Sequence, residues 1–129
     1  MPRPALAAAL AAAAGLRFVV VGSAALQLHG ADMRPRDLDI VPDPSDVDRF
    51  DEVMDAWTVV RRPPRRAFDG DIVTVDSAYG PIDLLLRRGR EAYADLRASA
   101  TMVDVEGVAV AIAAAADCWA LRRRFKGET

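Results

Sequence analysis

The sequence is poor in several residue types on which common sites and compartments depend. Its 129 residues include one cysteine, Cys118, and one histidine. A single cysteine excludes an internal disulfide and a zinc site built from cysteines, and it is typical of a reducing compartment. No uncharged apolar run reaches the roughly 18 residues that a membrane-spanning helix needs. We therefore expect a cytoplasmic protein that does not enter a membrane.

Neither sign of charge dominates the composition. The chain has 17 Lys and Arg against 19 Asp and Glu, a formal net charge of -2, so the whole molecule is not a general attractor of nucleic acid. A hydrophobic share of 52% and a charged share of 28% predict one soluble globular domain over residues 1–129. Acids concentrate in residues 32–55 and arginines in 61–66, 87–90 and 122–124. This distribution allows separate acidic and basic surfaces.

The apolar pattern predicts helices mixed with strands. Helical spacing indicates helices over residues 4–16, 23–29, 45–57, 90–98 and 113–124. Short apolar runs indicate strands over 18–21, 38–41, 72–75, 82–86, 102–105 and 108–112, with turns at 79–81 and 106–107 that predict hairpins. The two prolines within 61–66 predict a loop there. The expected fold is α+β (α/β), with a mixed β-sheet flanked by helices.

Three acids stand out within this pattern. Asp37 and Asp39 are two apart at the start of an expected strand, so their side chains project to the same side with Cα atoms roughly 6.5 to 7 Å apart. Asp83 is the lone acid in the apolar run Ile82–Leu86. Carboxylates are ligands that Mg²⁺ accepts together with substrate phosphates, and a third acid is what a two-metal site needs. The pattern predicts a divalent metal site.

A glycine and a serine follow the first buried strand. Gly22 lets the backbone approach a ligand closely, and the first turn of the next expected helix offers free N–H groups to an anion. Ser23 adds a hydroxyl donor. Structural interpretations stay open for both motifs, because Asp-x-Asp arises by chance, Asp37 alone suits a cap or an arginine partner, and Gly-Ser is a common capping pair.

Taken together these residues resemble a known family. Val21-Gly22-Ser23, then Arg34-Pro35-Arg36-Asp37-Leu38-Asp39-Ile40, then Ile82-Asp83-Leu84 resemble the minimal nucleotidyltransferase fold of the polymerase β superfamily. The resemblance covers nearly the whole chain and is closest to AbiEii-type toxins, the MNT antitoxin partners and aminoglycoside nucleotidyltransferases. It implies a Mg²⁺-dependent or Mn²⁺-dependent enzyme that moves a nucleoside monophosphate from an NTP to a hydroxyl acceptor on RNA, protein or a small molecule. ATP is the favoured donor, and the settings that the resemblance suggests are a toxin-antitoxin system and a modification system.

The resemblance also assigns roles by position. Asp37, Asp39 and Asp83 become the catalytic metal ligands, and Asp83 helps to activate the acceptor hydroxyl. The nucleotide contacts fall to four residues: Gly22, Ser23, Arg36 and Arg122. Arg122 stands where relatives often carry a lysine, so a planar fork replaces a point charge at the phosphates.

Two other functions remain open at this point. The first is a catalytically silent nucleotidyltransferase-like module that binds a protein partner, as an antitoxin does. It draws support from the shortness of the chain, which suggests that a partner or a second copy supplies the acceptor surface. The second is a phosphotransfer domain that uses acidic strand ends. It fits less well, because no Gly-Thr follows Asp39 and the only lysine, Lys126, lies outside the expected strands.

Overall fold

The computed structural model describes residues 3–61, 65–67, 70–87 and 92–125. The elements in chain order are α1 (Pro4–Ala13), β1 (Phe18–Val21), α2 (Gly22–Leu28), β2 (Leu38–Pro42), the 3₁₀ helix η1 (Pro44–Asp46), α3 (Val47–Asp55), β3 (Thr58–Arg61), β4 (Arg65–Ala67), β5 (Gly70–Ser77), β6 (Gly80–Arg87), α4 (Tyr93–Ala98), β7 (Thr101–Val105), β8 (Val108–Ile112) and α5 (Ala115–Phe125). None of the described helices is long and apolar enough to cross a membrane.

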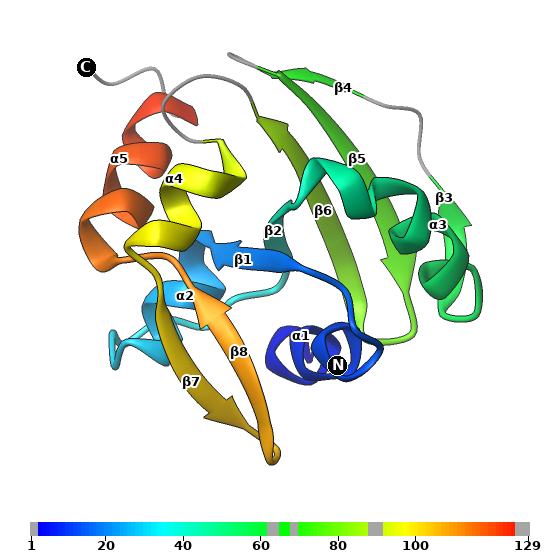
Figure 1. Cartoon of the computed structure of the whole chain (residues 1–129), viewed down its shortest axis with the longest axis horizontal. Coiled ribbons are helices and arrows are strands. Elements are labelled where there is room, and N and C mark those ends of the chain that lie inside the picture. The colour runs from blue at the N-terminus through cyan, green and yellow to red at the C-terminus, as the bar shows by residue number, and fades with distance from the viewer. Residues whose placement is uncertain (1–2, 62–64, 68–69, 88–91, 126–129) are drawn as a thin grey trace.

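The strands form one mixed sheet in the order β3-β5-β6-β2-β1-β8-β7, and β4 pairs with β5 (Figure 1). β1 runs antiparallel to β2 and parallel to β8, whereas β2 runs parallel to β6. Two hairpins, β5–β6 and β7–β8, complete the sheet. The expected α+β fold with a mixed sheet flanked by helices is therefore confirmed.

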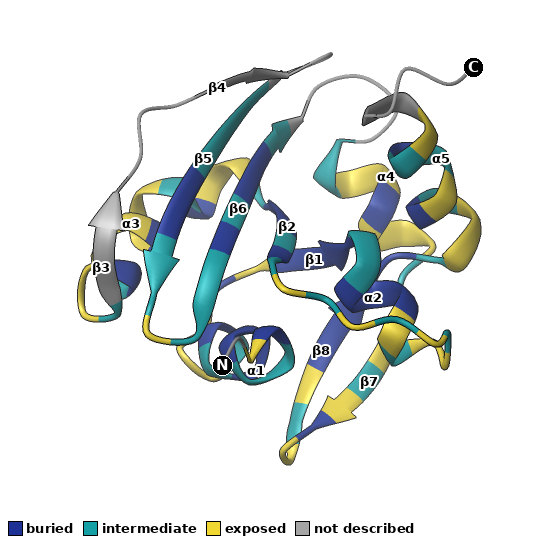
Figure 2. Cartoon of the chain, turned by 180° about the vertical axis from the view of Figure 1, so that it is seen from behind, coloured by how far each residue is buried: buried dark blue, intermediate teal, exposed yellow. Residues whose placement is uncertain are grey.

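Helices cover both faces of this sheet. α1 and α3 lie in front of it in Figure 1, and α2, which packs against α5, lies in front of β1 when the molecule is seen from behind in Figure 2. All four residues of β1 are buried, because a central strand with helices on both sides meets apolar neighbours on each face. The centre of the core lies where β1 meets β2.

Alternation along β2 and β6 separates the core from the acids. Leu38 and Ile40 of β2 are buried, as are Ile82 and Leu84 of β6, and they share one face of the sheet because every second side chain points the same way. That face packs against the helices at the front of Figure 1, where the rings of Phe18 and Phe50 meet edge to face at 5.7 Å. The residues between them, Asp39 and Asp83, therefore face α2 and α5.

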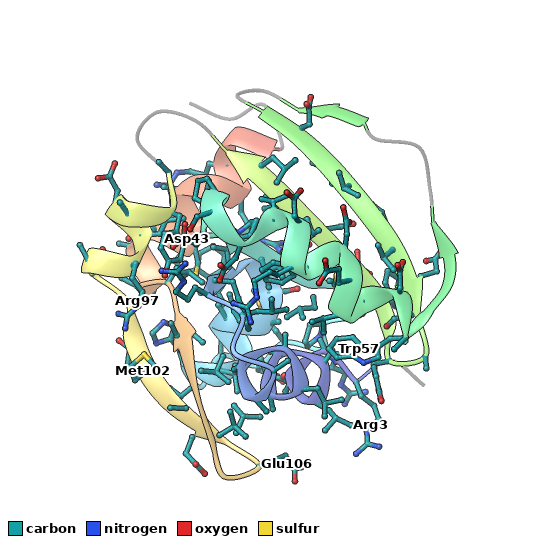
Figure 3. The ribbon with its side chains drawn as sticks, turned by 45° about the vertical axis from the view of Figure 1, so that its right-hand side comes forward. Arg3, Asp43, Trp57, Arg97, Met102 and Glu106 are labelled. Atoms are coloured by element: carbon teal, nitrogen blue, oxygen red, sulfur yellow. The ribbon has the colours of Figure 1, made fainter. Side chains whose placement is uncertain are left out.

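An arginine and an acid form hydrogen bonds at the end of the β1–β2 pair where Phe18 pairs with Pro42. Arg17, just before β1, donates its backbone N–H and its Nε–H to Asp46 Oδ2 at 2.9 and 3.1 Å, and its Nη2 to Oδ1 at 3.1 Å. The Asp46 side chain is 2% exposed. These hydrogen bonds hold the pKa of Asp46 at about 2. Asp43, labelled in Figure 3, lies 3.5 Å from Arg17 Nη1.

The structure differs from the sequence prediction mainly beyond α3. β3 is not predicted from the sequence, and Arg61, Arg65 and Arg66 belong to strands where a loop is expected. Pairing of β3 and β4 with β5 explains the difference, because an edge strand gains hydrogen bonds that local sequence does not reveal. Pro63 and Pro64 of the expected loop lie outside the described residues.

Candidate metal and nucleotide site

A row of paired residues crosses four neighbouring strands. Val21 pairs with Asp39, Asp39 with Asp83, and Asp83 with Thr74. Directly paired residues project to the same side of a sheet. The pairing of β2 with β6 therefore brings together two acids that are 44 positions apart in the sequence numbering.

The third acid lies just before β2. Asp37, Asp39 and Asp83 each offer a carboxylate oxygen, and these oxygens all lie within 4.8 Å of one another. Asp37 is the most exposed of the three. The three residues that the sequence singles out as metal ligands thus converge in space, and we refer to them as the acidic triad.

Burial and like charge act strongly on Asp39. Loss of hydration raises its pKa most, followed by the charge of Asp83, a hydrogen bond with Asp83 and the charge of Asp37, and together they raise it to about 8. The positive charge of Arg122 offsets only part of this rise. At neutral pH the triad is therefore a place where a cation is favoured and the ionisation of Asp39 is resisted.

Gly22 is required beside the triad for two independent reasons. Its φ of +70° is a conformation that L residues rarely adopt. A Cβ added there would also lie 2.5 Å from Asp39 Oδ2. The glycine therefore lets the Asp39 carboxylate lie directly against the first turn of α2.

Thr74 is a site residue that the sequence analysis does not identify. Its hydroxyl donates to Asp83 Oδ1 at 2.5 Å, and the residue is 2% exposed. The hairpin register carries the missing signal: counting back from the Ser77–Gly80 pair next to the turn brings Thr74 opposite Asp83. A buried hydroxyl that donates to one oxygen fixes the orientation of that carboxylate.

The triad opens into a cavity of about 220 Å³. Its lining comprises Val21, Gly22, the three acids, Ile72, Leu85, Leu121 and Arg122. Arg122 also lies over the ring of Trp119, 5.9 Å from its centroid, a distance at which a guanidinium is attracted to an indole face. Trp119 is 42% exposed, and this contact restrains the guanidinium that lines the cavity.

Two of the predicted nucleotide contacts lie elsewhere. Ser23 follows Gly22 in α2 and is half-buried, but it does not line the triad's cavity. Arg36 lines a separate cavity together with Arg3 and Arg34. Of the four residues predicted to contact the nucleotide, the structure therefore brings Gly22 and Arg122 to the acidic triad.

Comparison with solved structures gives one clear similarity. The crystal structure of a provisionally assigned nucleotidyltransferase from Thermotoga maritima superposes with a TM-score of 0.72, covering 98% of this chain and 88% of that one at 14% sequence identity. This chain has a nucleotidyltransferase-like fold. No protein-family model matches the sequence, and comparison with curated proteins gave no significant match. The nucleotidyltransferase-like fold is therefore recognised through its three-dimensional arrangement.

The donor set of the triad fits a hard divalent cation. Carboxylate oxygens are the ligands that Mg²⁺ and Mn²⁺ prefer, and no cysteine or histidine belongs to the cluster. The raised pKa of Asp39 has the same implication, because three neighbouring carboxylates ionise together only when a positive charge compensates them. Asp37, Asp39 and Asp83 are the residues that could hold such an ion.

Proposed function

We propose that the protein is a nucleotidyltransferase that depends on Mg²⁺ or Mn²⁺ and moves a nucleoside monophosphate from an NTP to a hydroxyl acceptor, with AMP from ATP as the favoured case. The observation that carries the proposal is the convergence of three carboxylates beside Gly22, one from the segment just before β2, one from β2 and one from β6. The nucleotidyltransferase-like fold supports the same reaction class.

The metal would contribute charge neutralisation at the transferred phosphate and a lower pKa of the acceptor hydroxyl. In this proposal Asp37, Asp39 and Asp83 hold it. Asp39 could serve in this way because the positive charge of a bound ion would offset the loss of hydration and the neighbouring negative charges that raise its pKa.

The remaining residues orient the reactants. Gly22 contacts the triphosphate inside the cavity, Ser23 contacts it from just outside, and the Arg122 guanidinium, which lines the cavity, neutralises the departing pyrophosphate. The acceptor oxygen attacks the α-phosphorus, the bond to the β-phosphate oxygen breaks, and Asp83 accepts the acceptor's proton. Thr74 donates to Asp83 Oδ1 and so fixes the orientation of this carboxylate. We do not carry the expected nucleotide contact of Arg36 into this proposal, because its side chain lines another cavity.

The volume of the cavity limits what it can hold. Sites for small molecules usually measure about 300 to 1,000 Å³, and the cavity at the triad measures about 220 Å³. We infer that it takes the reacting end of the triphosphate, while the base and the acceptor lie outside it.

Label transfer tests the proposal. The protein is incubated with ATP labelled at the α-phosphate or at the γ-phosphate, with Mg²⁺ or Mn²⁺ and a cell extract that contains RNA, protein and small molecules. We expect transfer of the α label only, loss of transfer in Asp37→Asn with Asp39→Asn, and normal transfer in Asp104→Asn, an exposed acid of β7.

The alternative outcomes separate the competing functions. Transfer of the γ label alone would indicate a kinase and contradict the proposal. Metal-dependent ATP binding without transfer of either label would favour the silent protein-binding module. If the resemblance to toxin-antitoxin nucleotidyltransferases extends to the role, expression of the active protein slows growth of a host cell and expression of Asp39→Asn does not.

A further inference from the structure

A second cavity has a volume of about 570 Å³, and its lining includes Arg36, the residue next to Asp37 of the triad. Three exposed arginines, Arg3, Arg34 and Arg36, line it together with Gln27 and Glu106; we refer to it as the arginine cavity. Its volume falls within the usual range for small-molecule sites. Three positive charges against one negative charge make it a place where an anion is favoured.

The backbone around the arginine cavity is anchored on two sides. The Arg3 backbone N–H donates to the carbonyl oxygen of Tyr79 in the β5–β6 turn at 2.8 Å. The Gln27 side-chain amide donates to the carbonyl oxygen of Met33 at 3.1 Å, which ties the segment 31–37 to α2. Figure 3 shows Arg3 beside the start of α1 and Glu106 at the tip of the β7–β8 turn, both at the lower edge of the view.

The guanidinium groups have no protein counterion among the described residues. The ion pairs found there join Arg17 and Arg49 to acids of the η1 region, and none involves Arg3, Arg34 or Arg36. Exposed arginines can be fully hydrated, but three that converge on one cavity repel one another unless an anion binds. A guanidinium presents five N–H donors in a fixed fork that matches phosphate oxygens.

The two cavities meet within one short segment of chain. Arg34 and Arg36 line the arginine cavity, and Asp37 and Asp39 line the cavity of the triad. Consecutive Cα atoms are about 3.8 Å apart, so the backbone of Arg36, which lines one cavity, adjoins that of Asp37, which lines the other. In Figure 2 this segment, between α2 and β2, crosses the face of the molecule with α1 below it in the view.

We propose that the arginine cavity binds a phosphate group of the acceptor and so directs a hydroxyl of the same molecule into the triad. The proposal deepens the proposed transfer reaction and rests on it, because only that reaction requires an acceptor. Phosphate is favoured over carboxylate because a phosphate ester offers oxygens to several forks at once, and because sugar phosphates carry hydroxyls close to their phosphates. The source is either a nucleic-acid strand or a small phosphorylated sugar.

Binding measured in EDTA separates this proposal from the transfer reaction. The probes are a fluorescein-labelled single-stranded RNA of twelve nucleotides, ribose 5-phosphate, and a polyglutamate peptide of similar charge. At 50 mM salt we expect Arg34→Gln with Arg36→Gln to weaken binding of a phosphate probe by about tenfold or more. Arg97→Gln, an exposed arginine of α4, is the matched control and should bind as the wild type does.

Each probe identifies a source. Tight RNA binding whose salt dependence becomes shallower in the arginine variant indicates a nucleic-acid acceptor, and binding of ribose 5-phosphate alone indicates a small one. Partial recovery in Arg34→Lys with Arg36→Lys is expected, because charge returns without the fork. Binding of neither phosphate probe, equal binding by wild type and variant, or preference for the peptide overturns the proposal.

The transfer assay then distinguishes the two hypotheses. Asp39→Asn should keep arginine-dependent phosphate binding in EDTA and lose transfer, whereas the arginine variant should keep metal-dependent ATP binding and raise the KM for the acceptor. If phosphate binds but the wild-type protein transfers no label, the proposed function fails and the phosphate site stands. If transfer occurs with an unchanged acceptor KM in the arginine variant, the assignment of the cavity fails and the enzyme stands.

Discussion

The two ends of the β1–β2 strand pair carry acids in opposite electrostatic situations. At the end where Phe18 pairs with Pro42, Asp46 receives hydrogen bonds from Arg17, and its pKa is about 2. At the other end Val21 pairs with Asp39, whose neighbours include Asp37 and Asp83 and whose pKa is about 8. Strands of four or five residues span only about 13 to 17 Å, so both situations occur within one small element.

This difference in pKa distinguishes an acid that the fold pairs with an arginine from an acid that the fold surrounds with other carboxylates. Removing a carboxylate from water is costly, and the cost is offset only when a partner and hydrogen bonds accompany it. The chain supplies that partner to Asp46. Around Asp39 it supplies mostly further negative charge, so without a bound ion Asp39 keeps its proton up to about pH 8.

The largest expected effect is at the triad. Asp39→Asn should lower label transfer by about 10³-fold, because it removes a metal ligand, and should stabilise the metal-free protein at pH 8 by removing a buried charge. Transfer rates and thermal unfolding in EDTA measure the two effects, with Asp104→Asn as the control. Loss of both activity and stability would mean that Asp39, like Asp46, serves the fold.

At the other end of the strands the same substitution should have the reverse effect. Asp46→Asn leaves Arg17 with a weaker acceptor in a buried position, so we expect Tm to fall by several degrees. Label transfer, measured well below the Tm, should stay close to that of the wild type. A Tm within one degree of the wild type, roughly the error of such a measurement, would remove the contrast between the two ends.

Gly22 and Gly30 offer a matched pair for the close contact at the triad. Both have positive φ, but a Cβ at Gly22 meets Asp39 Oδ2, whereas a Cβ at Gly30 meets nothing within 4 Å. Each alanine substitution should cost about 1 to 2 kcal/mol of backbone strain. Only Gly22→Ala should also lower label transfer, by about 10²-fold, because it displaces a metal ligand. Equal activity in the two variants would contradict the assigned contact.

Thr74 tests whether the orientation of Asp83 matters. Thr74→Val keeps the shape and removes the donor to Asp83 Oδ1, so we expect kcat to fall by about tenfold with little change in ATP binding. Thr74→Ser should recover most of the rate. A split between kcat and KM is the informative result, because a purely structural role would lower stability without altering that ratio.

The pH dependence of stability sharpens the comparison without any substitution. Between pH 3.8 and about 8 folded Asp39 holds a proton that the unfolded chain has lost, so the free energy of unfolding should fall by more than about 1 kcal/mol as pH rises from 5 to 8. Asp46 acts with the opposite sign: its contribution is present above pH 3.8 and is lost as pH falls toward 2.

Urea unfolding in EDTA across this pH range measures both effects on the free energy of unfolding. Mg²⁺ should reduce the fall in this free energy above pH 5, and so should Asp39→Asn. The loss of stability at acidic pH should persist in both cases, since it is due to Asp46. A flat profile between pH 5 and 8 in the wild type without metal would contradict the electrostatic account of the triad.

Local sequence predicts much of this structure. Each of the signals used is contained in a few consecutive residues: the β-branched run of β1, the Asp-x-Asp spacing, and the lone acid in the apolar run of β6. The turns of both hairpins are local signals of the same kind. These signals locate β1, β2, the two hairpins and all three acids of the triad, because strand periodicity decides which side chains share a face.

What sequence analysis misses depends on contacts between distant segments. β3 forms by pairing with β5, and Thr74 gains its role only from the hairpin register. Arg36 and Asp37 are adjacent in the sequence, yet they line different cavities. Likewise nothing local distinguishes Asp46 from Asp39, because the difference lies in whether the fold brings an arginine or two carboxylates beside them.

The pairing of Asp39 with Asp83 across adjacent strands has a consequence for ion selectivity. The spacing between hydrogen-bonded strands, about 4.8 Å, is a constant of the peptide backbone, so the sheet acts as a ruler for the two carboxylates. Mutation of surrounding side chains can change the orientation or the charge of an acid, but it does not change the spacing between the two strands. Asp37 lies outside the strand, so its position relative to the other two acids is not set by this spacing, and a preference of the proposed metal site for a larger ion would be reached most easily there.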